Sequence, residues 1–357
     1  MDFAYKFPVV KGRQAGRPYY IAMVPLKMLS RLFQGEEDYV PPEYRAQRKL
    51  NESRIPEIKE YILGNSDNYV FSALAASIDG DTEFVDGGIK GLGTLEVSMD
   101  SRFLINDGQH RVAAILEAIA ASPELGDETI SIVLYGDEGL QRSQQMFTDL
   151  NKHAVRTSNS ISELYDSRDE MAVATRKIVS LVPFLDRYID KEKDNLGKFS
   201  SSLFTLNSFY KANVKALSGR EISETVLNTL VIFWTLVCEN MVPWIELQEG
   251  SLKKLELREC SITTQSVLIQ ALGRVGCKMM DMSKAEMASY LSLLRKIDWN
   301  RSAPMWKLRV VNIDGKIIGK STGIILAANA IQQSIGLALN DDESSKEAKF
   351  RQTTGKE

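Results

Sequence analysis

The residues of this chain whose types and spacing are best suited to chemistry form one short run, Asp107-Gly-Gln-His-Arg111. Arg111 offers a planar fork of donors for a phosphate, and His110 adds a donor that becomes charged near neutral pH. Gly108 permits close approach of the backbone to a ligand, and Gln109 can position a base or a ribose. Asp107 can hold Arg111 or a magnesium ion. The run therefore predicts a phosphate- or nucleotide-binding site.

The run lies where the sequence predicts a change from strand to helix. Residues 102–105 are an apolar run suited to a buried strand, and residues 110–121 form an alanine-rich segment with strong helix propensity. The first N–H groups of a helix favour a bound anion. His110 and Arg111 add positive charge to a helix start that prefers negative charge, so an anion beside them would relieve the repulsion.

Two alternatives compete with a binding site at this corner. In the first, Asp107 caps the helix while Arg111 pairs with a carboxylate, so that both residues only stabilise the fold. In the second, the corner is catalytic, and Asp107 with a bound Mg²⁺ acts together with His110 to hydrolyse ATP or CTP. Both alternatives use the same residues as the binding site and stay open at this stage.

A second polar group follows the helix predicted for residues 140–150. Asn151 and Lys152 stand in a loop that can fold over the first run and contribute to the same phosphate or nucleotide. In the alternative, Asn151 only ends the helix and Lys152 complements the negative end of its dipole.

The composition limits the class of protein. The chain has 357 residues, of which 44% are hydrophobic and 25% charged, and a formal net charge of −3. This length predicts roughly two domains, and the charge lacks the basic excess of a simple nucleic-acid binder, so any DNA contact must be local. Three cysteines without a Cys-x-x-Cys pair and only two histidines argue against a disulfide framework and a metal site. Without an apolar leader or spanning segment, the sequence predicts a cytoplasmic protein with no membrane contact.

The pattern of expected elements changes near residue 160. Residues 1–159 alternate short apolar strands with helices and are predicted to form an α/β (α+β) core, whereas residues 160–300 have almost wholly helical periodicity. Residues 301–340 predict a hairpin, with its turn at Asp314-Gly315, and then a helix, both packing back on the core. The chain becomes polar from residue 341, and we expect residues 341–357 to be disordered.

Two groups of basic residues are candidates for DNA contacts. One begins ahead of a predicted helix in the first half, and the other is interleaved with aromatic residues in the helical half. Alternatively, the first group is a solvated helix surface and the aromatic residues of the second belong to the core. The candidates are Arg45, Arg48, Lys49 and Arg54 in the first group, and Lys198, Lys211, Lys215 and Arg220 in the second.

Several stretches of the chain resemble those of a known family. The run at residues 107–111 is similar to the motif that gives the DGQHR-domain family its name. Three further blocks resemble the DndB family of bacterial DNA sulfur modification proteins, and the resemblance covers most of residues 1–340. The blocks are Arg54-Ile-Pro-Glu-Ile-Lys-Glu-Tyr-Ile, Met146-Phe-Thr-Asp-Leu-Asn-Lys-His-Ala and Met305-Trp-Lys-Leu-Arg-Val.

This resemblance implies a role in DNA phosphorothioation, in which sulfur replaces a non-bridging oxygen of the DNA backbone. It implies an accessory protein that binds DNA and regulates transcription of the modification genes, while other DNA sulfur modification proteins carry out the sulfur transfer. A nucleotide hydrolase that uses the same corner is the first alternative. A non-catalytic adaptor of the modification complex is the second.

A wider resemblance links the predicted core to the ParB/sulfiredoxin superfamily. There, a strand–turn–helix corner of the form Gly-x-(His/Arg)-Arg-x-x-Ala binds nucleotide phosphates, and Gly108, His110, Arg111 and Ala114 match it. Sulfiredoxins place their catalytic cysteine where this chain has Gln109. The resemblance therefore implies a ParB/sulfiredoxin-like core that binds phosphate without thiol chemistry.

Overall fold

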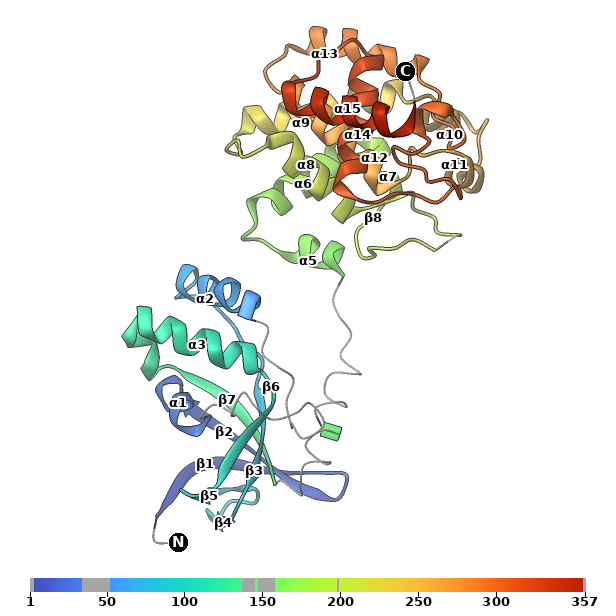
Figure 1. The fold of residues 1–357 in the computed structure, drawn as a ribbon. Coiled ribbons are helices and arrows are strands. Elements are labelled where there is room, and N and C mark those ends of the chain that lie inside the picture. Colours follow the sequence, from blue (N-terminus) through green and yellow to red (C-terminus); the bar gives the residue numbers. More distant parts are fainter. Residues whose placement is uncertain (1–2, 34–51, 137–144, 147–157, 198, 356–357) are drawn as a thin grey trace. The chain divides into compact units, whose positions relative to one another are not determined.

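In the computed structural model, residues 3–33, 52–136, 145–146, 158–197 and 199–355 are described. The chain divides into two units, residues 1–155 and residues 156–357, which we call the sheet unit and the helical unit (Figure 1). The mixture of one large sheet with many helices confirms the α/β class that the sequence predicts.

The sheet unit is organised around a seven-stranded mixed sheet of order β4-β5-β1-β2-β7-β3-β6. β3 runs parallel to β7, and the other neighbouring strands are antiparallel. The strands are β1 (Ala4–Gln14), β2 (Arg17–Pro25), β3 (Leu74–Asp79), β4 (Thr82–Asp86), β5 (Leu92–Ser98), β6 (Arg102–Asp107) and β7 (Thr129–Gly136).

Alternating side chains of these strands and one side of the helices form the core of the sheet unit. Ile130, Ile132 and Leu134 of β7 are buried, as the two-residue period of a strand requires when one face is covered. α3 adds Val112 and Ile115 at helical spacing and packs on α2. The helices are η1 (Leu26–Met28), α1 (Leu29–Leu32), η3 (Glu52–Arg54), α2 (Ile55–Gly64), α3 (Gln109–Ala121) and η4 (Pro123–Asp127).

The helical unit consists almost entirely of helices, as predicted from residue 160 onward, with one short parallel strand pair. Its strands are β8 (Ile189–Asp190) and β9 (Phe204–Thr205). Its helices are α5 (Asn159–Tyr165), α6 (Glu170–Leu181), α7 (Pro183–Tyr188), α8 (Leu206–Leu217), α9 (Glu224–Asn240), α10 (Val242–Glu249), α11 (Lys254–Cys260), α12 (Ser266–Met279), α13 (Lys284–Leu291), η5 (Ser292–Lys296), η6 (Pro304–Trp306), α14 (Ser321–Ser334) and α15 (Asp341–Thr354).

The close approach of α8 and α12 sits at the centre of the helical unit. A Cβ built on Gly273 of α12 would lie 2.2 Å from the carbonyl oxygen of Ala212 of α8, so only glycine allows the two backbones to meet there. Trp234 is fully buried, and its indole N–H donates to Oδ1 of Asn213 on α8 at 2.8 Å. Of the aromatic residues interleaved with the second basic group, Phe204 and Phe209 are buried in the core, as the alternative expects, whereas Phe199 is exposed.

Residues 301–340 differ from the prediction in two ways. The expected hairpin is reduced to a tight turn that Gly315 closes with φ +75°, and a single bridge pairs Val311 with Ile317. The expected packing on the α/β core is wrong, because Ile324, Ala327 and other residues of α14 enter the core of the helical unit beside α12. The apolar face of α14 specifies burial but does not specify the partner.

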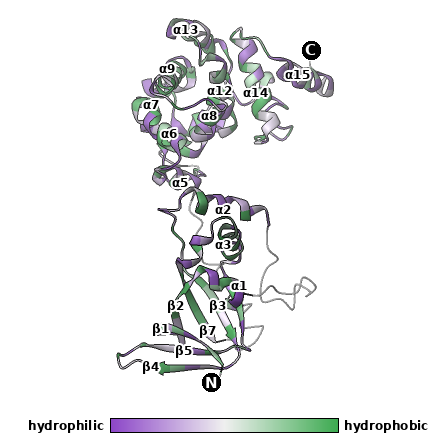
Figure 2. Ribbon diagram, turned by 90° about the vertical axis from the view of Figure 1, so that its left-hand side faces the viewer, coloured by the Kyte–Doolittle hydropathy of each residue, from purple (hydrophilic) through white to green (hydrophobic). Residues whose placement is uncertain are grey.

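The predicted disorder from residue 341 is also wrong, because residues 341–354 form α15. The helix is mostly hydrophilic, as its purple colour in Figure 2 shows, yet Glu343, Glu347 and Phe350 are buried. Glu347 accepts from Nη1 of Arg309 at 2.6 Å, and Glu343 pairs with Nζ of Lys278 at 2.6 Å. Buried carboxylates with cationic partners replace the apolar residues that the sequence pattern lacks.

Within the described residues, no single helix has the length and apolar composition required to cross a membrane. The pair α9 and α10 meets both criteria only when taken together, and these two helices are bent by 71° at their junction.

Candidate functional site

The strand-to-helix corner predicted around residues 102–121 is confirmed. β6 ends at Asp107 and α3 begins at Gln109, so Gly108 alone makes the change of direction. Gly108 has φ +105°, and a Cβ built on it would lie 2.4 Å from Cδ2 of Leu74. The corner itself thus requires glycine at this position, apart from any close approach to a ligand.

Arg111 holds the corner in place through its guanidinium group. Nη1 donates to the carbonyl oxygen of Ser72 at 2.5 Å, to Oγ of Ser72 at 2.7 Å and to the carbonyl oxygen of Ala73 at 3.2 Å. Nη2 donates to Oδ2 of Asp107 at 2.8 Å, in an ion pair whose arginine side chain is only 16% exposed. These bonds tie the first turn of α3 to the segment that enters β3.

The contacts of Arg111 support one half of the structural alternative. Arg111 pairs with a carboxylate, that of Asp107, as this alternative expects. Asp107 does not cap α3, however, because Gly108 is the N-cap residue and has no side chain to accept a hydrogen bond from the first N–H groups of the helix. Phosphate binding by Arg111 stays a prediction, and its guanidinium already has protein partners on both terminal nitrogens.

Gln109 and His110 occupy the first turn of α3, where a bound anion would meet the positive end of the helix dipole. Both side chains are half-buried, and both take part in interactions within the protein. The helix is 13 residues long, so its dipole is developed over several turns. The structure therefore brings all five residues of the predicted run, Asp107 to Arg111, to one corner.

Two residues beside the corner have roles that the sequence did not indicate. Ser72 supplies two of the oxygens that hold Arg111, although it is 39 residues away in the chain. Asn106 is 1% exposed and donates to Oγ of Ser77 at 2.7 Å, while its own Oδ1 is buried without a hydrogen-bond partner. β6 extends past the apolar run of residues 102–105 and includes Asn106.

Several predicted residues lie outside the described residues, and their roles stay predictions. They are Asn151 and Lys152 of the second phosphate-binding group, and Arg45, Arg48, Lys49 and Lys198 of the DNA-binding groups.

Three cations of the helical unit come together, and we call them the α8–α12 basic face: Lys211 and Lys215 of α8 and Arg274 of α12. Lys211 is exposed, and Lys215 follows it by four residues, which places both on one side of α8. Burial lowers the pKa of Lys215, and the positive charges of Arg274 and Lys211 lower it further. Arg274 and Lys211 are therefore close enough to Lys215 for their charges to act on it.

The remaining described candidates for DNA binding have different surroundings. Arg220 donates to both oxygens of Asp281, at 2.9 and 2.7 Å, so its charge is already paired on the surface. Arg54 is exposed immediately before α2. The structure thus brings Lys211 and Lys215 together and places Arg220 in an ion pair.

The described side chains contain no group of three or more histidine, cysteine, aspartate or glutamate residues arranged to hold a metal ion.

The fold and the candidate site together define a class of protein: a mixed-sheet unit with a strand–glycine–helix corner, followed in the chain by a helical unit with a local basic face. The chain matches the DndB family, described as DNA-sulfur modification-associated, over residues 7–338. Because this match covers nearly the whole chain, the protein belongs to the DndB family and is associated with DNA sulfur modification.

Comparison with curated proteins gives no match, and comparison with solved structures gives none either. The family therefore rests on the sequence match over residues 7–338. The ParB/sulfiredoxin-like character of the core stays a prediction.

Proposed function

We propose that this chain is an accessory protein of bacterial DNA phosphorothioation, acting in the cytoplasm as a DNA-binding regulator of the modification genes. Membership of the DndB family supports a role in DNA sulfur modification. The observation that carries the DNA-binding step is the α8–α12 basic face. Other DNA sulfur modification proteins are the partners that such an accessory role implies.

The basic face suits the backbone of DNA for an electrostatic reason. Arg274 and Lys211 lie close enough to Lys215 for their positive charges to oppose its protonation. The side chain of Glu343 offsets part of this charge, because it lies 3.3 Å from Nη2 of Arg274. A row of phosphates neutralises such a cluster and releases the counterions of the DNA, which favours binding. A chain with net charge −3 can then bind DNA through one local surface.

The test is the affinity for duplex DNA that spans the promoter of the chain's own modification genes, with an unrelated duplex of equal length beside it. The double variant Lys211→Gln/Lys215→Gln should weaken binding to both duplexes by roughly tenfold, since phosphate contacts are independent of sequence. The matched control is Lys191→Gln/Arg220→Gln, which also removes two cations, each already paired with an aspartate. Equal losses in the two double variants would contradict a DNA contact at the basic face.

The corner at Gly108 is a second candidate, as a phosphate or nucleotide site that takes ATP or CTP with Mg²⁺. The observation that favours it is the start of α3, where a glycine with φ +105° stands at the N-cap and no capping side chain occupies the approach from that residue. Asp107, Gly108, Gln109, His110 and Arg111 would surround the phosphate.

Titration of the protein with ATP and with CTP, each with Mg²⁺, tests the corner. We expect saturable binding that is weakened in His110→Ala, since this variant removes a donor from the helix start without touching the bonds of Arg111 to Ser72. Turnover of the bound nucleotide, lost in Asp107→Asn, would favour the hydrolase instead. Absence of binding together with co-purification of a modification protein would favour the adaptor.

A further inference from the structure

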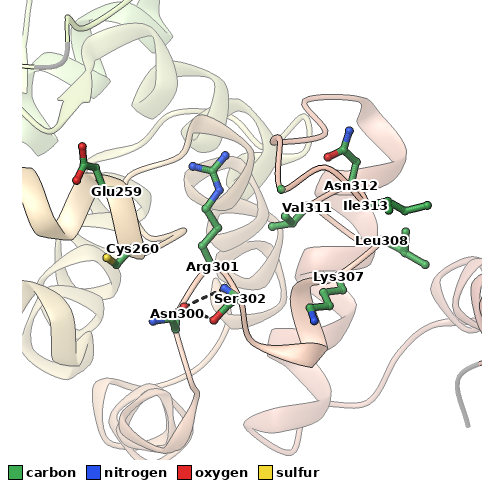
Figure 3. A pocket seen from close by; sticks show the side chains of 11 residues that line it. Glu259, Cys260, Asn300, Arg301, Ser302, Lys307, Leu308, Val311, Asn312 and Ile313 are labelled. Carbon is green, nitrogen blue, oxygen red and sulfur yellow. Dashed lines mark hydrogen bonds between the residues drawn. The ribbon is translucent and has the colours of Figure 1, made fainter.

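A pocket of about 640 Å³ lies in the helical unit, and none of its lining residues belongs to the basic face. Its walls are the end of α11, the loop that carries Arg301, and the turn that connects η6 to α14 (Figure 3). The lining is mainly apolar, with Leu308, Val311 and Ile313 on the side of that turn. The volume is in the range that accommodates a small organic ligand.

The walls of this pocket are held by backbone bonds, so the cavity is formed in the absence of a ligand. The N–H of Arg301 donates to the carbonyl oxygen of Cys260 at 2.6 Å, which joins its loop to α11. The N–H of Leu308 donates to the carbonyl oxygen of Val311 at 2.6 Å. Leu308 itself has φ +65°, a left-handed conformation that costs a residue with a Cβ on the order of 1 kcal/mol. Such strain persists where the surrounding structure needs it, and here it shapes the pocket wall.

Arg301 is the lining residue that favours an anionic ligand. Nε of Arg301 is buried and has no hydrogen-bond partner, and within the described part of the chain no oxygen accepts from the rest of its guanidinium. In Figure 3 the side chain points between Cys260 on one side and Val311 on the other. A buried donor without a partner is costly, and a charged one more so. An anion in the pocket would accept a charge-assisted bond from the terminal nitrogens of this guanidinium.

The other charged residues of the lining also favour a ligand of negative charge. Lys307 adds a second positive charge, and Glu259 adds one negative charge, so the lining carries one positive charge more than negative. Ile313 is 91% exposed, which leaves apolar surface for the body of a ligand to cover.

We propose that this pocket binds a small amphipathic anion, whose single carboxylate, sulfonate or phosphate group pairs with Arg301 and whose apolar body lies against Leu308, Val311 and Ile313. This site is independent of the DNA-binding and nucleotide-binding proposals, because it shares no residue with either.

Two fluorescent probes of similar shape test the proposal: 8-anilinonaphthalene-1-sulfonate, which is an anion, and N-phenyl-1-naphthylamine, which lacks the sulfonate. In Arg301→Gln we expect the affinity for the sulfonate to fall by roughly tenfold or more while that for the neutral probe is unchanged. Arg187→Gln is the matched control, since Arg187 is an exposed arginine of the helical unit outside the pocket. Equal affinity of the sulfonate for both variants would overturn the proposal.

The thiol of Cys260 can show whether the probe binds in this pocket, without any substitution in the protein. It is exposed and lines the pocket, whereas Cys238 is buried and serves as an internal reference. Saturating sulfonate probe should slow the alkylation of Cys260 by iodoacetamide several-fold, as measured by mass spectrometry of the wild-type protein. An unchanged alkylation rate at Cys260 would overturn the proposal even if Arg301→Gln failed to fold.

Discussion

At the scale of single residues, the guanidinium of Arg111 is already engaged by hydrogen bonds within the protein, which leaves little of it for a phosphate. Its guanidinium joins Ser72, Ala73 and Asp107, so it belongs first to the fold of the corner and second to any ligand. The helix start and His110 are therefore the parts of the corner that remain suited to a phosphate. Loss of ligand binding in a variant of Arg111 would be ambiguous, because it would combine a binding effect with a folding effect.

Arg111→Ala is expected to lower the free energy of unfolding by about 1.5–3 kcal/mol, since it removes several bonds from a charged donor that is largely covered. Denaturant unfolding of the sheet unit within the whole chain measures this. Arg102→Ala is the control, because Arg102 is an exposed arginine on the adjoining strand β6. Equal stability of the two variants would contradict the structural role of Arg111.

Glu163 of α5 provides a pH-dependent prediction. Burial is the main cause that raises its pKa from 4.5 to about 7. The negative charges of Asp194 and Asp169 also act upward, and Lys211 acts in the opposite direction. Folding then takes up a proton at Glu163 between the unfolded and folded pKa values, so this residue costs stability increasingly as pH rises from about 4.5 to about 7. One carboxylate oxygen, Oε2, is buried without a partner, which fits this cost.

Glu163→Gln should therefore be more stable than the wild type at pH 8, and the difference should shrink as pH falls toward 4.5. Melting temperatures of both proteins over this pH range measure the effect. The control is Glu170→Gln, at the first turn of α6, where the carboxylate is exposed. A gap between the wild type and Glu163→Gln that stayed constant with pH would refute the raised pKa.

At the scale of elements, the corner was predictable and α15 was not, for one physical reason. The change from β6 to α3 depends on local propensities and on one glycine, and these are visible within about 20 residues. α15 depends on a buried ion pair between Glu347 and Arg309, which are 38 residues apart. A polar helix with a distant cationic partner has the composition of a disordered tail.

The candidate sites also combine residues that are local in the sequence with partners that are distant in it. The run from Asp107 to Arg111 could be found from its residue types, but its partner Ser72 lies 39 residues earlier in the chain. The pairing of Arg220 with Asp281 joins residues 61 apart in the chain and likewise could not be predicted from a local pattern. The approach of Arg274 to Lys215 depends on how α12 packs on α8.

The role of α15 can be tested through Glu347. Burial alone raises the pKa of this carboxyl, but the hydrogen bonds and charges of Arg309 and Arg351 outweigh it and hold the pKa below its ordinary value. Its contribution to stability is therefore present above the unfolded pKa and is lost as pH falls through the lower folded pKa. Glu347→Gln should lower the free energy of unfolding by about 3 kcal/mol at pH 7, because it leaves a buried arginine without its ion pair.

The control for this variant is Asp342→Asn on the same helix, which removes an exposed pair with Lys346 and should change stability by less than about 1 kcal/mol. Thermal unfolding followed by circular dichroism compares the two. If Glu347→Gln behaved like Asp342→Asn, α15 would not depend on the buried pair.

At the scale of the whole molecule, the two units carry different candidate sites. The sheet unit supplies the corner at which a phosphate would meet the start of α3, and the helical unit supplies the basic face. A net charge of −3 gives the chain no general attraction to DNA, so binding must depend on a local group of cations and be sensitive to salt. Regulation of the modification genes would follow from occupancy of their promoter.

DNA binding by the α8–α12 basic face is tested most directly by the dependence of DNA affinity on salt concentration, recorded for the wild type and for Lys211→Gln/Lys215→Gln. Each phosphate contact contributes roughly −0.9 to the slope of log affinity against log salt, so the double variant should have a slope less steep by about 1.8. The control Lys191→Gln/Arg220→Gln should keep the slope of the wild type. Identical slopes for the wild type and Lys211→Gln/Lys215→Gln would contradict the claim that the α8–α12 basic face binds DNA.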